Sequence, residues 1–66
     1  MIKIKENKIY TIEGNSLKIL IFKILEETEN TIKATAALFH KQYNIYYGTE
    51  EFIIQKHISN LWQEIE

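Results

Sequence analysis

Cysteine, arginine and aspartate are absent from this 66-residue sequence, and glycine occurs only twice. Without Cys there is no disulfide, no thiolate metal site and no Cys nucleophile. Without Arg the chain lacks the usual bidentate reader of guanine, which weighs against sequence-specific DNA binding. The lack of Asp removes a common metal ligand and triad member. Two glycines are too few for a loop that cradles phosphate.

What remains is mostly aliphatic, with 45% hydrophobic residues, 13 of them Ile, and a net charge of −1. A chain of this length predicts a single domain over residues 1–66 that buries roughly 60% of its unfolded surface. The charge gives no sign of a polyanionic partner. No apolar run approaches the ~20 residues of a membrane span. The charged N-terminal segment does not resemble a signal peptide, so we expect a cytoplasmic protein without a membrane partner.

The first dozen residues have the pattern of a β-hairpin. Ile2 and Ile4 alternate with lysines, residues 6–8 can turn, and residues 9–12 resume an extended run. In that second strand, Tyr10 and Ile12 share one face, while Ile9 and Thr11 share the other.

Helical spacing dominates the rest of the chain. After a turn at Gly14 and a cap at Ser16, a first helix is predicted to end near Glu27. Its apolar stripe comprises Leu17, Leu20, Ile21, Ile24 and Leu25. A second helix is predicted from Thr31 to Tyr43, with Ile32, Ala36 and Phe39 on one side. A third, capped by Thr49, carries Ile54, Ile58, Leu61 and Ile65. The expected fold is α+β: a small winged-helix-like domain of order β-β-α-α-α.

No constellation of residues predicts catalysis or a cofactor. His40 and His57 lie on different predicted helices, and a zinc site needs three or four converging ligands. Neither Ser16 nor Ser59 lies in a Gly-rich elbow that would present a nucleophile. The neighbouring acids Glu26/Glu27 and Glu50/Glu51 point apart on a helix. We therefore expect no enzyme activity, no catalytic residue, no metal and no cofactor.

The aromatic residues near the C-terminal half allow two interpretations. Tyr43, Tyr46 and Tyr47 could form a stacking platform, although closing the core is the stronger interpretation for Tyr43. Trp62 is either a lid on the core or an exposed interface anchor, and dimerisation would use the anchor.

Residues 8–62 resemble PqqD-like proteins, the RiPP recognition elements that bind the leader segment of a ribosomally made precursor peptide. The resemblance rests on pattern and spacing. Its elements are Tyr10-Thr11-Ile12, Asn15-Ser16, Ile21-Phe22-Lys23-Ile24-Leu25, Asn30-Thr31-Ile32, Phe39 and Tyr43-Asn44-Ile45, followed by Ile54, Ile58 and Leu61. Three departures are a shorter sheet, an inserted Glu13-Gly14 and the absence of a Gly-(Leu/Ile) ending.

The resemblance implies a stand-alone module that binds a leader peptide as an added antiparallel strand and presents it to a modifying enzyme. The implied peptide site comprises Lys8, Ile9, Tyr10, Thr11 and Ile12 on the strand, with Ile53, Lys56, His57 and Asn60 on the third helix. Lys3, Lys5, Lys8 and Lys56 would favour an acidic leader.

Two other functions stay open on the sequence. One is a winged-helix DNA-binding regulator whose third helix presents Gln55, Lys56, His57, Ser59 and Asn60, although a single Lys there would neutralise phosphate poorly. The other is a phage or plasmid protein that inhibits a protein partner or forms a homodimer through its Tyr/Trp surface.

Overall fold

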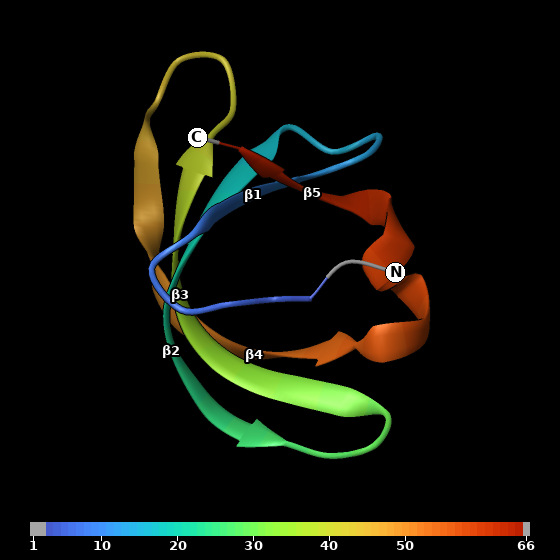
Figure 1. Cartoon of the computed structure of the whole chain (residues 1–66). Coiled ribbons are helices and arrows are strands. Elements are labelled where there is room, and N and C mark those ends of the chain that lie inside the picture. Colours follow the sequence, from blue (N-terminus) through green and yellow to red (C-terminus); the bar gives the residue numbers. More distant parts are fainter. Residues whose placement is uncertain (1–2, 66) are drawn as a thin grey trace.

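The structure, a computed structural model, describes residues 3–65 as one bent antiparallel sheet (Figure 1). Its elements are β1 (Ile9–Ile12), β2 (Leu17–Glu27), β3 (Thr31–His40), β4 (Tyr46–Gln55), a 3-10 helix η1 (Lys56–Leu61) and β5 (Trp62–Ile65). The strand order is β4-β3-β2-β1-β5. Strands β1 to β4 therefore follow one another as a meander, and β5 returns to pair with β1.

The predicted order β-β-α-α-α is wrong. The three segments expected to be helices form β2, β3 and β4 with η1 and β5. The predicted strand at residues 9–12 is confirmed, whereas residues 3–5 form no strand and Ile2 lies outside the described residues. Of the part of the chain that the structure describes, no helix is long and apolar enough to cross a membrane.

Two irregularities in β2 explain why its sequence imitates a helix. The pairing with β3 shifts between Ile21 and Lys23 and again between Ile24 and Glu26. Each β-bulge inserts an extra residue into the strand, so the inward-facing positions change from a spacing of two to a spacing of three. The residues that face the core side are Leu17, Ile19, Ile21, Ile24 and Glu27. This mixed spacing matches much of an amphipathic helical stripe.

Strands β3 and β4 keep the simple alternation of a sheet over most of their length. Their pairing shifts once, between Leu38 and Phe39, where Tyr47 is the extra residue on β4. On β3 the inward positions are Ile32, Ala34, Ala36 and Leu38, and on β4 they include Glu50, Phe52 and Ile54. Ala34 and Ala36 are fully buried, so their small side chains leave room for the larger groups opposite. The alanines that favoured a helix in the sequence therefore serve as small inward residues of a strand.

Polar residues taken as helix caps and breaks make the turns between strands. The Thr28 hydroxyl accepts hydrogen bonds from the N–H groups of Asn30 and Thr31, at 3.2 and 3.0 Å. Gly14 adopts φ 77°, a left-handed conformation that glycine tolerates, in the turn joining β1 to β2. The Asn15 side chain accepts from the Leu17 N–H at 2.8 Å in the same turn.

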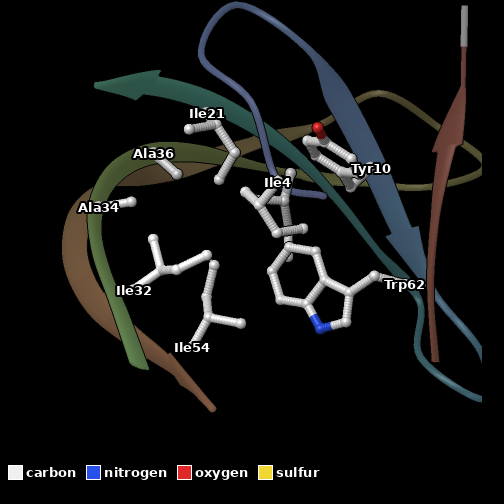
Figure 2. Packing of buried hydrophobic residues seen from close by; sticks show 9 residues of the cluster. Ile4, Tyr10, Ile21, Ile32, Ala34, Ala36, Ile54 and Trp62 are labelled. Carbon is white, nitrogen blue, oxygen red and sulfur yellow. The ribbon is translucent and has the colours of Figure 1, made fainter. Parts of the chain in front are cut away.

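The core lies inside the curve of the sheet (Figure 2). Tyr10 from β1 meets Trp62 from β5 edge to face, with ring centroids 6.0 Å apart. Ile4 packs beside this pair, and the Tyr10 hydroxyl accepts a hydrogen bond from the Lys5 N–H at 2.8 Å. The remaining buried members are Ile19, Ile21, Ile32, Ala34, Ala36 and Ile54. The N-terminal segment is thus held across the open side of the sheet.

We expect the substitution of isoleucine by valine to lower the free energy of unfolding at one position and to leave it nearly unchanged at another. Ile21 is fully buried, whereas Ile53 is 59% exposed on β4. Ile21→Val should lower the free energy of unfolding by about 0.5–1.5 kcal/mol, and Ile53→Val should change it by less than about 0.5 kcal/mol. Urea unfolding followed by Trp fluorescence would measure both. Equal losses at the two positions would contradict this fold.

Candidate functional site

The outer edge of β4 is the longest unpaired strand edge of the sheet. β4 runs for 10 residues at one end of the strand order, whereas β5 at the other end has four. Strand β3 pairs with one side of β4, and among the described residues no strand pairs with the other side (Figure 1). An edge of this length presents a row of backbone donors and acceptors to which another extended chain can pair.

The hydrogen bond after β4 fixes which of its backbone groups point outward. The Lys56 N–H donates to the Asn30 carbonyl at 2.8 Å. In an antiparallel ladder the bonded pairs recur at every second residue. From Gly48 to the end of β4, the even-numbered residues therefore bond to β3, and the free backbone groups belong to Thr49, Glu51, Ile53 and Gln55. Before Gly48 the pairing shifts by one residue, and the His40 N–H donates to the Ile45 carbonyl.

Large exposed side chains lie at both ends of this edge. Tyr46 and Tyr47 are 57% and 55% exposed near its start, and Ile53 is 59% exposed near its end. The Tyr46 ring packs against the Phe39 ring of β3, with the ring centroids 5.5 Å apart. The Tyr46 hydroxyl lies 2.6 Å from the Thr49 hydroxyl. Between these apolar groups lie two adjacent acids, Glu50 and Glu51. Along this edge, two acidic side chains in the middle are therefore flanked by aromatic or aliphatic side chains on both sides.

A hollow of about 250 Å³ opens on the inner face beside the same strand. We call it the concave pocket, and its lining comprises Ile12, Leu17, Ile19, Leu38, Glu50, Phe52 and Trp62. Phe52 and Trp62 stack with their rings 20° apart in plane and 6.3 Å between centroids. Every strand contributes at least one residue, so the bend of the whole sheet shapes the pocket.

A second hollow, of about 170 Å³, lies on the outer face. Ile9, Leu20 and Phe39 form its apolar lining. Lys18 reaches over it, with its ammonium 5.8 Å from the centre of the Phe39 ring and hydrogen bonded to the Asn44 side chain. Both faces of the central strands are therefore apolar, which is a further reason why β2 lacks a clear alternation.

The strand implied by the family resemblance lies in the middle of the sheet. β1 pairs with β2 on one side and with β5 on the other, so the backbone of residues 9–12 is engaged on both sides. Tyr10 is fully buried and Thr11 is 6% exposed, while Ile12 lines the concave pocket. Ile9 lies on the outer face, and Lys8 is exposed just before the strand. Strand addition at β1 would require displacing one of its neighbours.

The residues expected on a third helix do not gather in one groove with β1. Ile53 lies on the outer face of β4, which β2 and β3 separate from β1. Lys56, His57 and Asn60 lie on η1, where His57 and Asn60 are exposed. Lys56 is already paired, because its ammonium lies 2.7 Å from the Glu27 carboxylate. The recognition helix assumed in the DNA-binding alternative is replaced by a strand end and a six-residue 3-10 helix.

The aromatic and histidine residues named in the sequence analysis take part in the core or in a turn. Trp62 is 5% exposed, so it belongs to the core and is not an exposed anchor. Tyr43 is 66% exposed and stacks on His40 at 4.8 Å, so it does not close the core. The His40 Nδ1 accepts from the N–H groups of Gln42 and Tyr43, each at 3.2 Å, which orders that turn. Within residues 3–65, no three His or Glu side chains gather to hold a metal ion.

Sequence reasoning missed the residues that the fold brings together at β4. Glu50 and Phe52 are inner-face residues of one strand, and Leu38 and Trp62 reach the same pocket from β3 and β5. The sequence does contain a period of two in this segment. One face would carry the odd-numbered residues Thr49, Glu51 and Ile53, and the other the even-numbered residues Glu50, Phe52 and Ile54. Assigning the Thr49-Glu50-Glu51 run to a capped helix concealed it.

Comparisons with protein families, with curated proteins and with solved structures found no match for this chain.

The ion pair between Lys56 of η1 and Glu27 at the end of β2 predicts a measurable change in the pKa of Glu27. The hydrogen bond from Lys56, helped by its charge, lowers the pKa of Glu27. Its stabilising effect is present above the carboxyl group's ordinary pKa and is lost as the pH falls through the lowered value. Lys56→Met should therefore raise the pKa of Glu27 towards its ordinary range in a carboxyl NMR titration.

Lys33→Met is the matched control, because Lys33 pairs with Glu51 at 3.7 Å and not with Glu27. It should leave the pKa of Glu27 unchanged. An unshifted Glu27 in the Lys56→Met variant would show that the ion pair is not formed in solution.

Proposed function

We propose that the chain is a non-catalytic binding module that takes an extended segment of a partner protein as an added strand on the free edge of β4. The observation that carries the proposal is the ten-residue length of that edge with its outward backbone groups at Thr49, Glu51, Ile53 and Gln55. In strand addition, the backbone hydrogen bonds supply affinity and alternate side chains supply specificity.

The charges along β4 disfavour pairing with a second copy. The midpoint of the strand Tyr46–Gln55 falls at Glu50 and Glu51. A full antiparallel overlap of two β4 strands would bring the acids of one copy beside those of the other. Like charges directly opposite each other destabilise a strand pair. The preferred partner is therefore a different chain, with a basic residue near its middle and apolar residues on either side.

A precursor leader peptide is the ligand that the PqqD-like resemblance implies, with a modifying enzyme as the second partner. The acids of β4 favour a basic leader segment, in contrast to the acidic leader expected when the binding strand was placed at residues 8–12. The cytoplasmic location expected from the sequence stays a prediction.

The test uses ten-residue peptides selected by display on the full chain, together with candidate leader peptides. Ile53→Ala and Ile53→Pro both remove the Ile side chain, but only the Pro variant also removes the outward N–H. Proline is tolerated where the N–H of an edge strand faces solvent. We expect the Pro variant to bind the selected peptide about tenfold more weakly than the Ala variant. Titration by calorimetry measures both, and amide shifts should map to β4.

Peptides methylated at single backbone nitrogens provide an independent readout that needs no protein variant. Methylation should abolish binding at alternate ligand residues, those whose N–H faces β4, and should be tolerated at the residues between them. A uniform effect of methylation, shifts confined to other strands, or equal affinity of the Ala and Pro variants would overturn the proposal.

A further inference from the structure

The concave pocket combines an apolar interior with one charged group at its rim. Among the described residues that line it, Glu50 alone carries a charge, and aliphatic or aromatic side chains make up the rest. The walls include the stacked rings of Phe52 and Trp62. A ligand group that matches this lining has a long apolar portion and a positive end.

Glu50 is available for such an end. Among the described residues, the ion pairs are Lys33–Glu51 and Lys56–Glu27, and neither involves Glu50. The neighbouring acid Glu51 points to the opposite face, where Lys33 lies 3.7 Å away. Glu50 therefore supplies, on the inner face and beside apolar surface, a carboxylate that forms no ion pair with another described residue.

Strand β4 carries a glycine beside the pocket residues. Gly48 lies two residues before Glu50 and pairs with Leu38, a pocket residue. It has no side chain, and apart from Gly48 and its two chain neighbours no atom lies within 4 Å of the place where a Cβ would stand. A segment paired along the edge of β4 directs alternate side chains to the inner face. One of them, near Glu50, can enter the pocket past Gly48.

We propose that the concave pocket takes a lysine or arginine side chain of the bound segment, its aliphatic stem against the pocket walls and its cationic head at the Glu50 carboxylate. This inference rests on strand addition at β4 and names the residue type that the site selects. Lys and Arg suit the arrangement because they bury an apolar stem while the charged head stays at a wet rim. The rings of Phe52 and Trp62 add a surface that attracts cations.

A small-molecule probe separates this inference from strand addition, because it has no backbone to pair. The probe is hexylammonium, with hexanoate and hexanol as matched comparisons, titrated at low salt to limit screening. We expect hexylammonium to shift the Trp62 indole N–H and the methyl groups of Leu17, Ile19 and Leu38 in NMR spectra. Hexanol should bind more weakly, and hexanoate more weakly still.

Glu50→Gln and Glu51→Gln form the variant pair, since they make the same change on opposite faces of one strand. Glu50→Gln should weaken hexylammonium binding about two- to fivefold, and Glu51→Gln should leave it unchanged. Equal binding of hexylammonium and hexanol, an unchanged affinity in the Glu50→Gln variant, or shifts away from the pocket would each overturn the inference.

The Ile53→Pro variant distinguishes the two proposals. It should bind the selected peptide about tenfold more weakly than Ile53→Ala and keep hexylammonium binding, because the pocket does not use the outward N–H of Ile53. If peptides fail to pair with β4 while the probe still binds at Glu50, strand addition is wrong and the pocket retains its cation preference. If peptides pair but a Lys or Arg opposite Glu50 can be replaced by Leu without loss of affinity, the pocket assignment is wrong.

Discussion

The bend of the sheet is the constraint on which the rest of the structure depends. A chain of 66 residues with a single sheet has one way to enclose a core, which is to curl the sheet over itself. The bulges after Ile21 and Ile24 bend β2, and the small side chains of Ala34 and Ala36 make room inside the curve. Phe52 and Trp62, from the two strands at opposite ends of the strand order, then stack on each other inside the curve. The concave pocket lies on the inner face of the same bend.

The same bend also limited what could be predicted from the sequence. The strand at residues 9–12 was predictable, because its alternation is regular and Gly14 marks its end. The rest of the fold was not, because two bulges gave the inward residues of β2 a helix-like spacing and an apolar outer face hid its alternation. In β3, alanines that favour helices locally were selected by the space available inside the sheet. Tertiary packing decided these segments, and local propensity did not.

The candidate site was missed for a related reason. A resemblance built on spacing placed a binding edge at β1, which the fold pairs on both sides. Whether a strand is central or at an edge depends on pairing between distant segments, here the return of residues 62–65 to β1. No feature within residues 9–12 reports that pairing. The idea of strand addition survives as a proposal, moved to the strand that the topology leaves at the edge.

The pairing of β1 with β5 also carries a kinetic meaning. Strands β1 to β4 can join through local hairpins, whereas Ile9 meets Ile65 across almost the full length of the chain. Contacts between such distant residues form slowly, because a long loop must close before they contribute. Trp62 is brought against Tyr10 and Phe52 only by this closure. The pocket therefore depends on contact between the two most distant parts of the sheet in sequence, and an intact pocket reports that β5 has paired with β1.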